Sequence, residues 1–164
     1  MYGISDFALA KNIGVSRREA REFIERYFAR YPGVKAYMDG SVIEARERGY
    51  ALTLMGRRRY IPELLSGNYN LRSFGERCAM NSPIQGTAAD IIKLAMIRVD
   101  AELRRRGLQT KLILQVHDEL ILAAPEAEAE AAAALLRECM DSVMELTVPL
   151  RADVSTGSDW CACN

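Results

Sequence analysis

KLILQVHDELILAA, at residues 111–124, decides the fold class of this chain. Two strongly apolar runs, Lys111–Val116 and Glu119–Ala124, are separated only by His117 and Asp118. Such a pattern is typical of an antiparallel hairpin with a two-residue turn. These turns usually contain Asn-Gly or Asp-Gly because they need positive φ, and this turn has no glycine. The turn therefore goes against the usual preference for glycine at positive φ, and backbone strain of this kind often marks a functional site.

The residues after this hairpin predict the rest of a sheet-and-helix layer. Glu126–Leu146 is an Ala- and Glu-rich helical run with acids in its first turn, where the helix dipole favours them. Pro149–Ser155 has the pattern of one more strand. We therefore expect an α+β fold, with an antiparallel sheet that contains the 111–124 hairpin and packs against several helices.

Residues before the hairpin predict helices and a second, basic hairpin. Three helices are expected, over 4–13, from the capping box of Ser16 and Glu19 to about residue 31, and over 34–48 with Gly49 at the end. Tyr50–Leu54 and Arg59–Ile61 read as two short strands around a turn that carries Arg57 and Arg58.

Two further helices are expected between the basic hairpin and Lys111. The first covers Asn68–Ala79. For the second, Ser82 is placed to cap the N-terminus and Pro83 to occupy the first helical position, and the helix then runs to about Arg106. This second helix is apolar on most sides, which predicts a buried position.

Charged and polar side chains mark two candidate sites. Asp118 and Glu119, beside His117, could supply hard oxygen ligands to Mg²⁺ from the tip of a rigid hairpin, or could be solvated turn residues. Arg77, Asn81 and Gln85 follow each other at four-residue steps and could donate hydrogen bonds to the DNA minor groove, or could form a wet helix face.

The overall composition describes a soluble globular chain with a divided charge. It has 164 residues, 49% of them apolar and 27% charged, which suits one domain or part of a larger one. No run is long enough to span a bilayer and the N-terminus lacks the order of a secretory signal, so we expect a cytoplasmic location. Residues 1–111 hold 20 basic against 12 acidic side chains, and residues 112–164 hold 2 against 10. A basic front half suits a nucleic-acid partner, and the tip at Arg57 and Arg58 suits phosphate contacts.

Several segments resemble the family A DNA polymerases, the bacterial polymerase I family. Residues 115–120, QVHDEL, look like its motif C, and residues 81–92, NSPIQGTAADII, look like the helix that tracks the primer–template minor groove. Residues 27–34, YFARYPGV, and 56–60, GRRRY, resemble further family segments in the same order. The likeness covers nearly the whole chain and departs only in the cysteine-bearing tail, 158–164. It implies a single partial polymerase domain, with fingers-derived helices and the basic hairpin over about 1–75 and a palm portion over about 76–164.

The resemblance assigns roles to individual residues. Asp118 would be one of two aspartates that hold a catalytic Mg²⁺ pair, with Glu119 assisting and His117 near the primer terminus. Arg77, Asn81 and Gln85 would contact the primer–template, and Tyr2 would lie at the template base.

The reaction implied is the addition of deoxynucleoside triphosphates to a primer 3′ end. The second metal-binding aspartate, in motif A, is absent from this sequence, as are the fingers side chains that grip the triphosphate. We therefore expect a fragment that is inactive alone and needs the N-terminal polymerase portion as its partner. Two alternatives remain, namely a non-catalytic nucleic-acid-binding module derived from a polymerase and an unrelated metal hydrolase that uses Asp118 and His117.

Overall fold

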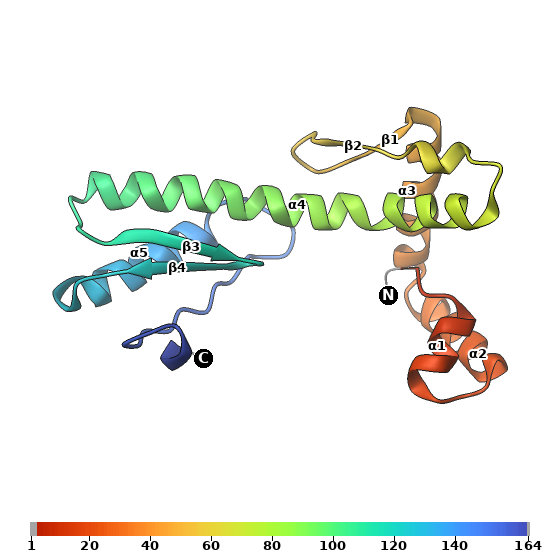
Figure 1. The fold of residues 1–164 in the computed structure, drawn as a ribbon, viewed down its shortest axis with the longest axis horizontal. Helices are drawn as coiled ribbons and strands as arrows, with labels where there is room; N and C mark the ends of the chain where they lie inside the picture. The colour runs from red at the N-terminus through yellow and green to blue at the C-terminus, as the bar shows by residue number, and fades with distance from the viewer. Residues whose placement is uncertain (1–2, 164) are drawn as a thin grey trace. The chain divides into compact units, whose positions relative to one another are not determined.

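The computed structural model describes residues 3–163, so the Tyr2 prediction lies outside the described residues. The chain divides into two compact units, one ending at Thr87 and the other beginning at Ala88. Secondary structure is mixed, with long helices and two small antiparallel sheets, which confirms the α+β prediction (Figure 1). Among residues 3–163, no helix is both long enough and apolar enough to cross a bilayer.

Three helices open the first unit, close to where the sequence predicts them. They are α1 (Asp6–Ile13), α2 (Arg17–Arg30) and α3 (Pro32–Arg48). The capping box forms as expected, because Ser16 and Glu19 bond to each other's backbone amides at 3.2 and 2.9 Å. Gly49 ends α3 with a φ of 78°, a left-handed conformation that favours glycine.

The basic hairpin forms from β1 (Tyr50–Leu52) and β2 (Arg58–Tyr60), with Ala51 opposite Arg59. A 3-10 turn, η1 (Pro62–Leu65), follows it. Both pack on the first part of the long helix α4 (Tyr69–Arg105), as Figure 1 shows for the hairpin. Their core is a small cluster of buried residues: Ala45, Ala51, Ile61, Leu64 and Ala79.

The prediction of two separate helices with Ser82 as an N-cap is wrong, because α4 runs through Pro83 without a break. Pro83 removes one backbone donor. The Ser82 hydroxyl donates to the Cys78 carbonyl at 2.5 Å instead of capping, and the Thr87 hydroxyl donates to the Pro83 carbonyl at 2.6 Å. Both hydroxyls thus bond to carbonyls of the same helix one turn earlier instead of capping a new one, and burial of one helix face against the hairpin favours the continuous form.

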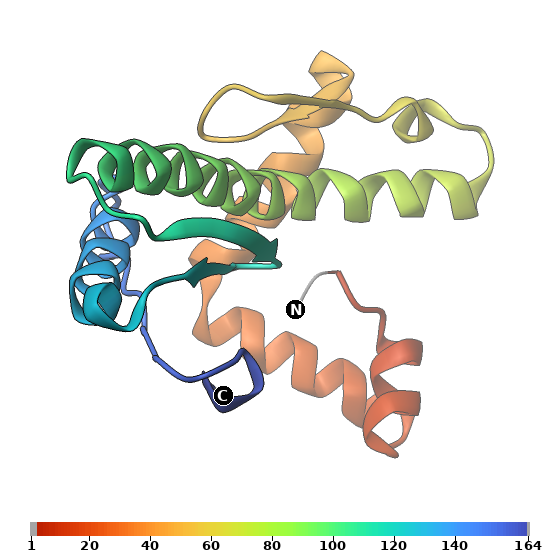
Figure 2. The same cartoon turned by 60° about the vertical axis from the view of Figure 1, so that its left-hand side comes forward.

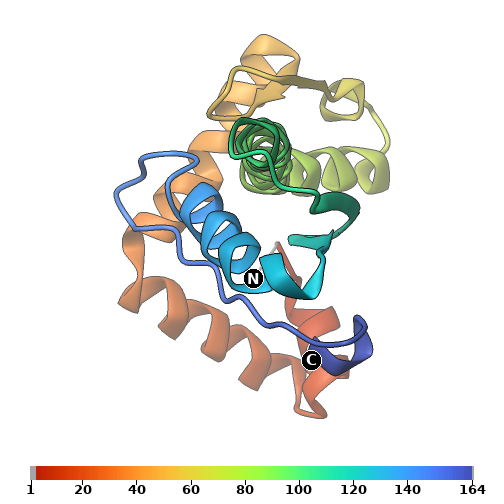
Figure 3. The ribbon, with the colours of Figure 1, turned by 90° about the vertical axis from the view of Figure 1, so that its left-hand side faces the viewer.

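The second unit contains the hairpin of β3 (Lys111–Val116) and β4 (Glu119–Ala123), as predicted. Val116 pairs with Glu119 across the turn, and a bulge lies between Leu112 and Leu114. A 3-10 turn, η2 (Glu126–Glu128), leads into α5 (Ala129–Asp141), so the predicted helix ends earlier than expected. The view along α4 in Figure 3 and the turned view in Figure 2 show the hairpin, α5 and the later part of α4 around one core. That core contains Val99, Leu120, Leu135 and Cys139.

The strand predicted over 149–155 is wrong, because the described chain has no strand there. The segment runs extended past α5 and is tied to it by the Ala152 amide, which donates to the Asp141 carboxylate at 2.6 Å. A strand is defined by a hydrogen-bonded neighbour, and the two sheets of residues 3–163 each contain only two strands. The sequence pattern identified an extended segment but could not supply its neighbour. A short 3-10 turn, η3 (Cys161–Cys163), ends the described chain.

Candidate nucleic-acid interface and carboxylate turn

The tip of the β3–β4 hairpin presents His117, Asp118 and Glu119 to solvent. His117 has a φ of 52° and is the one non-glycine residue with positive φ in the described part of the chain. The Gln115 side chain donates to the His117 carbonyl at 2.6 Å, which fixes the turn from the inside of the hairpin. A strained residue held by a specific bond agrees with the expectation of a functional turn.

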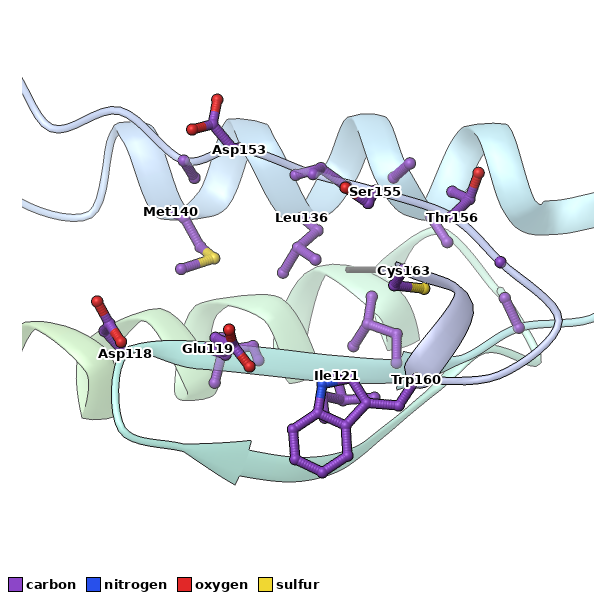
Figure 4. Close-up of a pocket in the computed structure, with 18 of the residues that line it drawn as sticks. Asp118, Glu119, Ile121, Leu136, Met140, Asp153, Ser155, Thr156, Trp160 and Cys163 are labelled. Carbon is purple, nitrogen blue, oxygen red and sulfur yellow. The ribbon is translucent and has the colours of Figure 1, made fainter.

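A groove of about 1030 Å³ opens beside this turn, within the second unit. Its walls are β4 on one side and the extended residues 150–160 on the other, with α5 above, as Figure 4 shows. Asp118 and Glu119 lie at one end of the groove, and Ile121, Leu136, Met140 and Trp160 line its length. The groove therefore has apolar side chains on β4 and α5, polar and charged ones along residues 151–159, and two carboxylates at the end that carries the turn.

The acidic end of the groove presents carboxylate oxygens to solvent. Asp118 and Glu119 are exposed carboxylates of the kind Mg²⁺ prefers. Within residues 3–163, no group of three or more His, Cys, Asp or Glu side chains is placed to hold a metal ion. Cys161 and Cys163 in the tail belong to no such group either. The described residues thus present two adjacent carboxylates at the turn and no complete set of metal ligands.

The other predicted site residues lie in the first unit. Arg77 and Gln85 are exposed on α4, and Asn81 between them is half-buried. Arg77 donates to the Ser73 hydroxyl at 3.1 Å. The four-residue spacing therefore places all three on the surface of a regular helix, as predicted.

The structure brings Gln85 together with the basic hairpin. A hollow of about 180 Å³ is lined by Gln85 and by the three arginines of the hairpin, Arg57, Arg58 and Arg59. The Arg58 guanidinium lies 4.9 Å from the centre of the Tyr50 ring, a cation–π distance. A hydrogen bond to Tyr60 raises the pKa of Arg58 above its usual value. In the sequence, the arginines of the hairpin and the polar residues of α4 were two separate signals. In the structure, Gln85 of α4 lies beside those arginines.

The comparisons with known proteins place the whole chain in one class. The profile of DNA polymerase family A matches residues 1–162, so the chain belongs to DNA polymerase family A. Among its relatives are the DNA polymerase I of Bacillus caldotenax, 56% identical over 160 residues, and that of Bacillus subtilis (strain 168), 55% identical over 160 residues. Both alignments cover 98% of this chain but only 18% of the relative.

One solved structure is similar over nearly the whole length of this chain. The POL domain of Pol1 from M. smegmatis, in complex with DNA primer-template and dNTP, superimposes with a TM-score of 0.96 at 46% identity. It covers 99% of this chain, and this chain covers 29% of it. The motif C and helix resemblances noted in the sequence are thus confirmed as membership of the family.

Proposed function

We propose that this chain supplies the motif C carboxylate turn and part of the DNA-binding surface of a DNA-directed DNA polymerase. The observation that carries the proposal is the β3–β4 turn, where strained His117 and the Gln115 bond hold Asp118 in place. Family membership over residues 1–162 supports it, as does the neighbour solved with primer-template DNA and dNTP.

The reaction is nucleotidyl transfer from a deoxynucleoside triphosphate to a primer. The primer 3′-hydroxyl attacks the α-phosphate, and pyrophosphate leaves. Asp118 would hold Mg²⁺, which polarises the phosphate and lowers the pKa of the attacking hydroxyl when bound. Glu119 would assist beside Asp118, and His117 would lie near the primer terminus. The carboxylates thus bind and orient, while the chemistry itself needs few other protein groups.

The DNA would be held by the first unit. Arg77, Asn81 and Gln85 would donate to minor-groove acceptors, which exist at every base pair and give contact without sequence selection. Arg57 and Arg58 would contact backbone phosphates. Tyr2, by family resemblance, would lie at the template base.

The N-terminal polymerase portion, which carries the second metal-binding aspartate, would complete the site. The groove beside β4 suits that portion, because within residues 3–163 β4 pairs only with β3, and a groove next to such an edge can accept an extended segment. We expect the assembled enzyme to serve DNA replication and repair in the cytoplasm. Without that portion, the carboxylates of the turn bind Mg²⁺ weakly and the chain does not extend primers.

A second candidate function is a nucleic-acid-binding module without catalysis. The observation that favours it is that no three His, Cys, Asp or Glu side chains of residues 3–163 are placed to hold a metal ion. The two functions differ in what Asp118 does, since a binding module would keep its affinity for DNA without that carboxylate.

Mixing this chain with the rest of a polymerase distinguishes the two candidate functions. Purified chain is combined with a separately produced N-terminal polymerase portion, and primer extension is measured with Mg²⁺. We expect extension by the mixture, none by either part alone, and a loss of at least a hundredfold with Asp118→Ala. Asp39→Ala, at an exposed aspartate on α3, is the matched control and should extend normally. Tight DNA binding with no extension by the mixture would favour the binding module, and extension by the chain alone would refute the claim of inactivity.

A further inference from the structure

A stripe of small residues on α4 lets the basic hairpin and η1 approach the helix backbone. Gly75, Ala79, Ser82 and Gly86 recur at steps of four, three and four residues, which places them on one helix face. Ala79 and Ser82 are buried. A Cβ added at Gly75 would lie 2.9 Å from the Leu64 nitrogen, and one added at Gly86 would lie 2.5 Å from the Thr53 methyl carbon. Any side chain at Gly75 or Gly86 would therefore force the hairpin or η1 to move away from the helix.

Thr53 connects this stripe to the loop of the basic hairpin, residues 53–57. Its hydroxyl oxygen accepts hydrogen bonds from the backbone amides of Met55 and Arg57, both at 3.2 Å. The Thr53 amide donates to the Arg57 carbonyl at 3.0 Å, which closes the loop across its base. The hydroxyl group of Thr53 thus shapes the loop that carries Arg57, while its methyl group lies against α4 at Gly86.

Thr87 adds a directional bond between the loop and the helix. It is a buried residue of α4, and its hydroxyl oxygen accepts a hydrogen bond from the Leu54 amide at 3.0 Å. The same hydroxyl donates to the Pro83 carbonyl at 2.6 Å, so its orientation is fixed. The loop is therefore fastened to α4 at two adjacent residues, by contact at Gly86 and by a hydrogen bond at Thr87.

We propose that Thr53, Gly86 and Thr87 are positioning residues, which hold the basic hairpin beside Gln85. The arginines of the hairpin then contact the phosphates of duplex DNA while Gln85 contacts its minor groove, as one surface. The proposal rests on the proposed function, because it names how the DNA-binding side chains are arranged. Arg57, Arg58 and Arg59 share one hollow with Gln85 only while the loop lies against the helix. A loop released from Thr87 would carry the same charges but would no longer hold its arginines at the phosphates that the ordered loop reaches.

The test measures phosphate contacts rather than stability. Binding of the full chain to a primer–template duplex is followed by fluorescence anisotropy over a series of KCl concentrations. Each phosphate contact contributes about 0.9 to the slope of log affinity against log salt. We expect Thr87→Val, which keeps the shape and removes the hydroxyl, to lower that slope by about 1 to 2. Thr87→Ser should restore it, and Thr147→Val, at an exposed threonine of the second unit, should leave it unchanged.

A double variant separates positioning from general loss of structure. In the wild-type chain, Arg58→Ala should lower the salt slope by about 1. In the Thr87→Val background the same change should have little further effect, because the arginine is already displaced. Additive losses would overturn the proposal, and so would an unchanged slope in Thr87→Val or a failure of Thr87→Ser to restore it.

A measurement on the wild-type chain covers the case in which Thr87→Val does not fold. Amide hydrogen exchange should show the Leu54 amide protected, although it lies in an exposed loop, because Thr87 accepts from it. Rapid exchange at Leu54 would overturn the proposal. Absence of salt-dependent DNA binding by the wild-type chain would instead refute the proposed function, so the two failures are distinguishable.

Discussion

The Gln115 side-chain amide lies 2.6 Å from the backbone carbonyl of His117, the residue with a φ of 52° at the start of the β3–β4 turn. The bond joins the last part of β3 to the turn itself, so the side chain supports the conformation that glycine would otherwise provide. Asp118 follows directly, and its direction depends on this support.

Removing that support is expected to destabilise the hairpin. Gln115→Leu keeps much of the side-chain volume but loses the donor, and we expect the free energy of unfolding to fall by about 1 kcal/mol. Urea denaturation followed by circular dichroism measures it. Gln109→Leu, in the loop before β3, removes the same amide group and should change stability much less. Equal effects of the two substitutions would mean that the Gln115 bond does not hold the turn.

The second unit should depend strongly on one leucine of α5. Leu135 is fully buried among Val99, Leu120 and Cys139. Leu135→Ala leaves a cavity there and should lower the free energy of unfolding by about 2 to 5 kcal/mol. Leu65→Ala, where the side chain is 75% exposed, is the matched control and should stay within about 0.5 kcal/mol. A small loss at Leu135, measured by thermal denaturation, would contradict the core described for this unit.

A carboxylate gives the second unit a defined pH dependence. The Glu128 side chain accepts hydrogen bonds from the backbone amides of Gln109 and Thr110, at 3.0 and 2.9 Å, and from the Thr110 hydroxyl at 2.7 Å. These bonds, the Gln109 amide first, hold the pKa of Glu128 below its ordinary 4.5. Because the pKa is lowered on folding, the stabilisation is complete above pH 4.5 and is lost as the pH falls through the folded-state pKa.

Glu128→Gln tests this pH dependence. We expect the variant to melt below the wild type at pH 7 and the difference in melting temperature to shrink as the pH falls below 4.5. Glu130→Gln, at an exposed position in the first turn of α5, is the control. A difference that stays constant with pH would show that the carboxylate charge is not what Glu128 contributes.

The chain alone should self-associate through apolar surface of its second unit. Ile113, at the β3 bulge, is 59% exposed, and Trp160 beside the groove is 46% exposed. Exposed apolar area of this kind favours association. Sedimentation velocity should show an average mass that rises with concentration, and Ile113→Lys should reduce the rise, whereas Gln109→Lys should not. A monomer at all concentrations would argue against this surface.

Local signals explain which parts of the fold the sequence predicted. The 111–124 hairpin, the Ser16 capping box and the Gly49 helix end each depend on residues within a few positions of one another, and each was confirmed. The Ser82-Pro83 signal was equally local but was overruled, since Ser82 and Thr87 bond to nearby carbonyls and tertiary packing favours one continuous helix.

Contacts between distant residues explain what the sequence missed. The extended 149–155 segment cannot become a strand without a neighbour, and no residue pattern within the segment reveals whether one is present. Gly86 is informative only because Thr53, more than thirty residues earlier, lies against it. The small-residue spacing of 75, 79, 82 and 86 was visible in the sequence and could have indicated a close approach, although not to which partner. The roles of the predicted site residues stay predictions until extension and binding are measured.

The glycines that close the two ends of the α4 stripe make the mutational tolerance of this helix sharply uneven. In a saturation library of the chain selected for folding and DNA binding, Gly75 and Gly86 should reject even alanine, because an added Cβ would lie 2.9 Å and 2.5 Å from the atoms opposite them. Exposed Ile84, only two positions before Gly86, should accept many side chains. Positions two residues apart would then differ in tolerance for a geometric reason, so the tolerated positions of that library would map the part of the helix that the hairpin covers.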